Sequence, residues 1–294
     1  MPQFRRVLVL FAISAIGSVV APTVGHAVYR PPIHSMPNVA RSRGRQHANS
    51  EPITYHGGPV MTGPVNVYVI WYGDWATRAK RRAILTEFMQ HLASPYWNIN
   101  RTFPSASGLA VDATPVLAGQ LDDKGSVGTK ELSDEQIQQV VTSAISRTAL
   151  ANDPNGIYLV LTSSAVTKAG FLSEYCGWHS FARVGATTIK FGFIGDPSGP
   201  KVRSCSPQSV SINGDTGADA MASTILHELD ETVTDPTMRG WRTARGEENA
   251  DRCAWQYGKV YKSGAGNANM RLGARDYLIQ MNWLNSLTPH CAVS

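Results

Sequence analysis

The stretch that organises this chain is ADAMASTILHELDETVTDP, residues 218–236. If it is helical, its apolar residues repeat at spacings of three and four and form one buried face, made of Met221, Ala222, Ile225, Leu226, Leu229 and Val233. Ionisable residues interrupt the middle of the same segment, namely His227, Glu228, Asp230 and Glu231. Because ionisable groups beside a buried face must be solvated, paired or bound to a metal, this helix predicts chemistry as well as packing.

The spacing of these ionisable residues predicts a metal site. On an α-helix His227 and Glu231 are i and i+4, so their side chains lie one above the other. This is the arrangement of the zinc-protease motif H-E-x-x-H, with Glu231 in the place of the second His. We therefore expect His227 and Glu231 to bind one zinc ion and Glu228 to act as the catalytic base. The alternative is that His227 belongs to a local hydrogen-bond network and the acids face water.

A third ligand is expected from GEENADRC, residues 246–253. In thermolysin-like zinc peptidases a Glu roughly 20 residues beyond the second ligand completes the site, and a nearby Asp orients a ligand. On a helix either Glu247 or Glu248 would share a face with Asp251, so the sequence leaves open which Glu points inward. We take Glu248 as the third metal ligand and Asp251, together with Asp235, as orienting residues. The alternative is a solvated helix end.

Composition limits the classes of protein to consider. The chain has 294 residues, of which 43% are hydrophobic and 17% charged, so it can bury a large core and is not a disordered protein. Its formal net charge of +5 is small for this length and does not indicate a nucleic-acid partner.

The N-terminus reads as a secretory signal. Arg5 and Arg6 precede an apolar run over residues 7–20, and small residues around Ala27 provide a cleavage site, so residues 1–27 are expected to be removed. We expect residues 28–50, rich in Pro, Arg and Ser, to form a flexible extension. Residues 51–294 are expected to form a single α/β domain with no transmembrane segment.

Secretion makes the cysteine count informative. The chain has four cysteines, an even number that favours two disulfides in an oxidising compartment. Spacing alone allows three pairings. We favour the pairing of sequence neighbours, Cys176 with Cys205 and Cys253 with Cys291, because it closes the shorter loops. The spacing of these cysteines is not that of a zinc knuckle or a redox motif.

Apolar periodicity predicts an α/β fold. Buried strands are expected at residues 65–72, 157–162 and 187–194, with another strand at 115–118. Helices are expected around residues 84–92 and after Ser133, where S-D-E-Q is a capping box. A helix between two strands indicates a parallel βαβ unit. We therefore expect a zincin-like twisted mixed sheet with the active-site helix packed on it.

Four blocks of the sequence resemble a known family. GGPVMTGPVNVYVIWYGDW (57–75), GIYLVLTSSAVTKAGF (156–171), YCGWHSF (175–181) and ILHELDETVTDP (225–236) are similar, in this order, to blocks of the EXORDIUM family of secreted proteins. This family is also called the phosphate-induced protein 1 family. Its plant members are associated with the cell wall and growth responses, and membership implies no settled biochemical activity. The H-E-x-x-E helix looks more like a microbial-type member.

The resemblance also draws attention to His179 in the block YCGWHSF. It could be a further metal ligand or a donor to the transition state. The alternative is a structural hydrogen bond, which is the commoner role for a His beside a disulfide.

Two classes of function follow from these observations. The first is a secreted zinc-dependent hydrolase that acts on an extracellular peptide or a cell-wall substrate. The second is a non-catalytic extracellular protein that binds cell-wall polysaccharide through some of its seven tryptophans, which could stack on sugars. A glycosidase with two carboxylates is a third option, although nothing in the sequence sets the separation that it requires.

Overall fold

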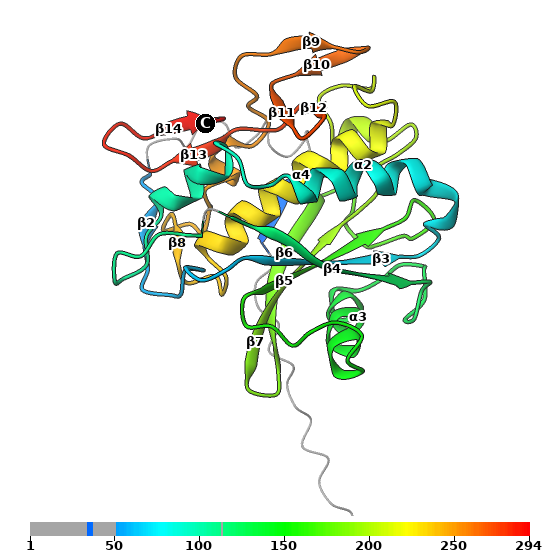
Figure 1. Ribbon diagram of the computed structural model, residues 1–294, viewed down its shortest axis with the longest axis horizontal. Helices are drawn as coiled ribbons and strands as arrows, with labels where there is room; N and C mark the ends of the chain where they lie inside the picture. The colour runs from blue at the N-terminus through cyan, green and yellow to red at the C-terminus, as the bar shows by residue number, and fades with distance from the viewer. Residues whose placement is uncertain (1–33, 38–50, 113) are drawn as a thin grey trace, which may run out of the picture. The chain divides into compact units, whose positions relative to one another are not determined.

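A twisted six-stranded sheet lies at the centre of the structure, a computed structural model that describes residues 34–37, 51–112 and 114–294 (Figure 1). The strands are β1 (His34–Pro37), β3 (Asn66–Tyr72), β4 (Val116–Asp123), β5 (Gly156–Thr162), β6 (Tyr175–Val184) and β7 (Thr187–Ile194). Their spatial order is β1-β6-β7-β5-β3-β4. β4, β3, β5 and β7 are parallel, whereas β6 runs antiparallel to β7 and β1 antiparallel to β6. The expected α/β fold with a mixed sheet is therefore confirmed.

Two helical layers cover this sheet. α2 (Ala79–Gln90) and α4 (Thr216–Thr234) lie on one face and α3 (Asp134–Ser146) lies on the other (Figure 1). The alternation of β3 shows why both faces are apolar: Val67 and Val69 pack in the core with α2 and α4, and Tyr68 and Ile70 pack in the core with α3. β3, β5, β7 and the three helices appear where the periodicity placed them, and the strand expected at residues 115–118 is the start of β4.

β6 is the main element that the sequence did not predict. Gly177 and the buried polar residues His179 and Ser180 interrupt the apolar pattern of this ten-residue strand. Its register with β7 runs from Gly177 opposite Ile194 to Val184 opposite Thr187, so all of β7 pairs with it. As a result the block YCGWHSF lies in the sheet rather than in a loop.

α4 is buried on all sides, not on one face as its periodicity suggested. Asp215 caps it, with its carboxylate accepting from Ala218 N at 2.9 Å, and it ends at Thr234 just before Pro236. Every residue from Gly217 to Thr234 is buried. Besides β6, β7 and α2, the 3-10 segment η2 (Trp97–Thr102) and strand β12 (Arg275–Tyr277) contact it. The charged residues of α4 therefore find their partners inside the protein.

The chain after α4 forms short elements instead of the expected second helix. The prediction of one helical face for residues 247–251 is wrong, because only a 3-10 turn, η4 (Asp251–Cys253), forms there. The short β8 (Trp241–Arg242) pairs with β2 (Thr54–Tyr55). The other short strands form three antiparallel pairs: β9 (Tyr261–Ser263) with β10 (Gly266–Ala268), β11 (Met270–Leu272) with β12, and β13 (Asn282–Leu284) with β14 (His290–Ala292).

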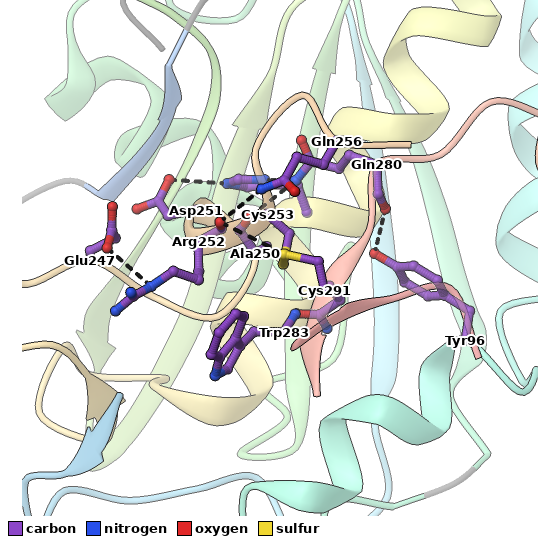
Figure 2. The surroundings of a disulfide bond; sticks show 12 residues. Tyr96, Glu247, Ala250, Asp251, Arg252, Cys253, Gln256, Gln280, Trp283 and Cys291 are labelled. Atoms are coloured by element: carbon purple, nitrogen blue, oxygen red, sulfur yellow. Dashed lines mark hydrogen bonds and ion pairs between the residues drawn. A yellow bond between two sulfur atoms is a disulfide. The ribbon is translucent and has the colours of Figure 1, made fainter. Parts of the chain in front are cut away.

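Both disulfides join the predicted partners. Cys176 in β6 is bonded to Cys205, next to the turn η3 (Val202–Ser204), and Cys253 in η4 is bonded to Cys291 in β14. In Figure 2 the second bond ties the C-terminal strand to the turn that carries Asp251. Two structural disulfides fit a protein of an oxidising compartment.

The N-terminal predictions fall largely outside the described residues. These are the signal peptide at 1–27 and most of the extension at 28–50. Within that extension, however, residues 34–37 are a strand of the sheet because they pair with β6. Among the helices of the described residues, none is long and apolar enough to cross a membrane.

Removal of the Cys253–Cys291 bond tests its role in holding η4. The double change Cys253→Ala with Cys291→Ala is expected to lower the free energy of unfolding by about 2–4 kcal/mol, because it releases a loop constraint on the unfolded chain. Denaturant unfolding measures this loss. Amide exchange should also rise at η4, which it should not do in the control pair Cys176→Ala with Cys205→Ala. An η4 that exchanges equally in both variants would contradict the assignment.

Candidate functional site

Two histidines and four acids meet beside α4 in the interior of the protein. They come from α4, from β6 and from the segment that leads into η4, and all are buried except Asp251, which is partly buried. We call this group the α4 cluster: His179, His227, Glu228, Glu231, Glu248 and Asp251.

One half of the cluster is built on the predicted i, i+4 pair. His227 Nε2 lies 3.0 Å from Glu231 Oε1 and 3.6 Å from Asp251 Oδ1. The backbone N–H of Asp251 also donates to Glu231 Oε1 at 3.0 Å, so the η4 turn is joined directly to the helix. This half brings together an imidazole and two carboxylates from two separate segments.

The other half of the cluster is organised by His179. Its Nδ1 lies 3.3 Å from Glu228 Oε2 and 3.5 Å from Glu231 Oε2, and its Nε2 lies 3.6 Å from Glu248 Oε2. Because Glu231 Oε1 faces His227 and Glu231 Oε2 faces His179, this one carboxylate joins the two halves. Glu231 is therefore the central residue of the cluster.

The donor atoms have separations that a metal ion could use. In each of two sets, His227–Glu231–Asp251 and His179–Glu228–Glu231, one ligand atom per residue lies within 4.8 Å of the others. Zinc–nitrogen and zinc–oxygen bonds of about 2.0–2.2 Å are compatible with such separations, and a mixed imidazole and carboxylate set suits zinc. The residues present therefore fit a single cation held around Glu231.

The acid that lies beside His227 and Glu231 is Asp251, whereas Glu248 was expected there. The predicted set was His227, Glu231 and Glu248, but the structure brings Asp251 to His227 and places Glu248 at His179. Glu248 is fully buried whereas Glu247 is partly exposed and pairs with Arg252, with 3.3 Å between Glu247 Oε2 and Arg252 Nε. Of the two acids between which the sequence did not decide, Glu248 is thus the one that points inward.

Burial and charge act in opposite directions on the two imidazoles. Burial lowers the pKa of His179, but the neighbouring carboxylates, Glu248 foremost, outweigh it and raise that pKa to about 10. Burial likewise opposes protonation of His227, whose pKa nevertheless rises well above its usual value beside Glu231. Burial raises the pKa of Glu228 and of Glu248. In the absence of a cation, protons on the imidazoles offset the carboxylate charge.

Gln280 is a site residue that the sequence did not indicate. Its side-chain amide hydrogen-bonds to His227 Nδ1, while His227 Nε2 faces the carboxylates of Glu231 and Asp251. With the amide turned so that its oxygen accepts from Nδ1–H, the lone pair of Nε2 is available to a cation. Gln280 follows β12 in a segment with no motif spacing, so no sequence signal pointed to it.

The other acids of the helix serve separate networks. Asp230 turns away from the α4 cluster and accepts from Asn100 Nδ2 at 2.7 Å and from Tyr96 OH at 3.0 Å, while burial raises its pKa to about 7. Figure 2 shows the Tyr96 hydroxyl directed at Gln280, whose backbone oxygen it also contacts at 3.0 Å. Asn100 is fully buried, so its sequon N-R-T is not an accessible glycosylation site in the folded protein.

Asp235, predicted as an orienting residue of the site, binds the turn that follows α4. Its Oδ1 accepts from the backbone N–H groups of Arg239 and Gly240, each at 2.5 Å. It therefore shapes the exit of the helix, and none of its hydrogen bonds reaches an imidazole of the cluster.

The tryptophans do not form an exposed stacking surface. All seven lie in the described part of the chain, where four are buried and three, Trp241, Trp255 and Trp283, are partly buried. Trp283 lies under the guanidinium of Arg252, with the Arg252 carbon 5.3 Å from the ring centroid (Figure 2). Trp241 packs on Tyr55 and Phe103. The four buried rings are not exposed for stacking on sugars.

A separate hollow lies where the parallel strands β3 and β4 end. It has a volume of about 410 Å³, and polar side chains from both strand ends and from α2 line it, including Asp74, Arg82, Asp122 and Lys124. The Arg82 guanidinium pairs with Asp122 at 2.5 Å and lies over the Trp71 ring. The carboxyl ends of parallel strands are a common place for ligands in α/β folds.

Comparison with known proteins places the chain among EXORDIUM relatives. Residues 53–276 match the family described as "Phosphate-induced protein 1 conserved region". Protein EXORDIUM-like 3 of Arabidopsis thaliana is 28% identical over 322 aligned positions, which cover 94% of each chain. Protein EXORDIUM-like 5 of the same plant is 28% identical over 274 positions, covering 79% of this chain and 75% of the relative. Protein PHOSPHATE-INDUCED 1 of Nicotiana tabacum is 26% identical over 255 positions, with coverages of 76% and 78%.

The comparisons confirm one expectation and leave another without support. No solved structure matches the chain, so no comparison supports the expected similarity of its fold to the zincins. The family resemblance read from the sequence blocks is confirmed, because the matched region is most of the chain. The chain belongs to the phosphate-induced protein 1 family, which includes the EXORDIUM proteins.

Proposed function

We propose that this protein is a secreted metal-dependent hydrolase whose active site is the α4 cluster. The observation that carries the proposal is the gathering of two buried imidazoles, two further buried carboxylates and the partly buried Asp251 around the buried carboxylate of Glu231. Removing charges from water is costly unless each is paired or bound to a metal. With four acids against two bases, a divalent cation would offset the excess negative charge. The protein would thereby gain both stability and a reactive centre.

The proposed ligands are His227, Glu231 and Asp251, and the proposed cation is one zinc ion. This set uses the i, i+4 pair of α4 and the acid that lies nearest His227 Nε2 after Glu231. Zinc supplies Lewis-acid activation of water or of a carbonyl group. Gln280 would hold the His227 ring in the orientation that directs Nε2 at the cation.

Glu228 is the proposed general base. It follows His227 directly on α4, and its Oε2 lies 3.3 Å from His179 Nδ1. Burial raises the pKa of Glu228, which makes this carboxylate a better proton acceptor than an exposed one. His179, which also contacts Glu248, would hold the Glu228 carboxylate in place and stabilise negative charge that develops next to it.

A second candidate function is polysaccharide binding in the hollow at the ends of β3 and β4. Its charged side chains can hydrogen-bond sugar hydroxyls, and Trp75 lines its wall. The names of the relatives specify no ligand, so this candidate depends on the hollow alone. We rank it second because the residues that line the hollow include no buried cluster of excess charge like the α4 cluster.

Metal content is the first test of the hydrolase proposal. Protein purified without chelator is expected to hold about one zinc ion per chain. His227→Ala should lose the ion, and Gln280→Leu should weaken zinc affinity by about 10–100-fold because the ring loses its orienting partner. Elemental analysis and chelator competition measure both effects.

The matched control for the metal test is Gln256→Leu. Gln256 and Gln280 both lie in the surroundings of the Cys253–Cys291 disulfide (Figure 2). The Gln256 amide donates to Arg252 O at 3.3 Å and not to a histidine. Its zinc affinity should equal that of the wild type. Wild-type protein without bound metal, and with an unchanged Tm in chelator, would contradict the proposal.

The role of Glu228 has its own test. Glu228→Gln should keep the zinc ion but lower peptide hydrolysis by about 10²–10⁴-fold, the range for loss of a general base. Release of new amino termini from a mixture of unstructured peptides measures the rate. Glu247→Gln, which alters a partly exposed acid outside the cluster, is the control and should leave the rate unchanged. Equal rates for wild type and Glu228→Gln would rule out this role.

The second candidate predicts a different pattern of effects. Asp74→Ala combined with Lys124→Ala should weaken retention on insoluble cell-wall polysaccharide by about 30-fold, because each change removes a polar contact worth roughly 1 kcal/mol. A pull-down with increasing amounts of polysaccharide measures the change. Glu228→Gln should bind as the wild type does. A wild-type protein that binds no wall fraction would dismiss this candidate.

A further inference from the structure

β1 occupies one edge of the central sheet beside the α4 cluster. Its backbone pairs antiparallel with β6, with residue 34 opposite His179 and Met36 opposite Gly177. Within the six-stranded sheet nothing else pairs with this side of β6. Without β1, β6 would therefore present an unpaired edge at the very strand that carries His179.

The backbone of β1 also touches the proposed general base. The N–H of Met36 donates to Glu228 Oε1 at 3.3 Å, and Oε2 of the same carboxylate lies beside His179. A backbone amide of an extended segment is thus held within reach of the proposed catalytic carboxylate. This is the position that an extended peptide would take if it paired with β6.

The side chain of Met36 fills an apolar pocket. Met36 is fully buried and packs with the Cys176–Cys205 disulfide, and partly buried Phe171, Leu172 and Trp255 lie around them. The pocket is next to β6 because Cys176 belongs to that strand. One side chain of β1 therefore has a dedicated pocket, while its backbone pairs with the strand.

Strand addition works in this way in peptide recognition: backbone pairing gives affinity, and pockets for particular side chains give specificity. β1 is suited to be displaced, because it has four residues and its register becomes irregular at Pro37, which has no N–H to donate. A short edge strand with one apolar anchor is weakly held compared with the central strands.

We propose that the β6 edge and the Met36 pocket form a groove for extended peptides, and that β1 is a built-in occupant that closes it. The peptide class is an extended segment with an unbranched or γ-branched apolar residue, such as Met or Leu, at the pocket. That this groove serves a substrate rests on the proposed hydrolase function, whereas peptide binding does not. β1 is one of the elements that cover α4, and its Met36 N–H donates to Glu228.

The test is exchange of β1 for a peptide in trans. The probe is a fluorescent synthetic peptide with the sequence of residues 32–39, PIHSMPNV. In the full chain carrying Met36→Asp, the new carboxylate would enter an apolar pocket beside Glu228, so β1 should leave the groove. This variant should bind the peptide at least tenfold more tightly than the wild type, in which the tethered strand competes at high effective concentration.

Matched controls distinguish specific binding in the groove from nonspecific peptide binding. A peptide with Asp in place of Met should bind neither chain, and Met36→Leu should behave as the wild type. Failure of the Met36→Asp chain to bind the Met peptide, or equal binding by wild type and variant, would overturn the proposal.

Hydrogen exchange on the wild-type chain provides a test that does not depend on the variant's folding. Amides of β1 should exchange by local opening, at least tenfold faster than those of the central strand β5. Exchange of β1 only with global unfolding would overturn the proposal, because a permanent strand cannot be a removable occupant.

The two proposals fail in different ways. Peptide exchange without any bound metal would remove the hydrolase function and leave the groove in place. Bound zinc without peptide exchange would do the reverse. Measuring zinc content and peptide binding on the same preparations distinguishes these outcomes.

Discussion

The burial of charge along α4 is the constraint on which the rest of the structure depends. A helix that carries His227, Glu228, Asp230 and Glu231 with no solvent-facing side must receive partners from elsewhere in the chain. β6 supplies an imidazole, the η4 turn supplies a carboxylate and a backbone N–H, and the segment after β12 supplies an amide. The short C-terminal hairpins and the Cys253–Cys291 disulfide hold these segments against the helix.

The acids of α4 divide into two environments with different chemistry. Asp230 accepts hydrogen bonds from the neutral side chains of Asn100 and Tyr96, so its carboxylate has partners without a cation. Glu231, in contrast, has one oxygen near each histidine. Asp230 therefore has a structural role and Glu231 a proposed metal-binding role, and the side of the helix on which each acid lies decides which.

Because the α4 cluster is buried, a substrate can reach it only if a segment that covers it is displaced. β1 is the segment best placed to move, since it lies at a sheet edge, is short and contacts Glu228 through its backbone. Family membership links the chain to plant relatives, but neither their names nor the family description, which refers to phosphate induction, specifies a reaction. The chemistry proposed here therefore rests on this chain's own residues.

The sequence by itself predicted the strands β3, β5 and β7, the helices α2, α3 and α4 and the favoured disulfide pairing, because local periodicity, capping and loop closure are short-range properties. It also identified His227, Glu228 and Glu231 from their spacing. Only the tertiary structure showed that Asp251 rather than Glu248 lies at His227, that His179 lies in a strand, and that Gln280 and β1 contact His227 and Glu228. These contacts join residues far apart in the chain, and no local pattern encodes a distance across a fold.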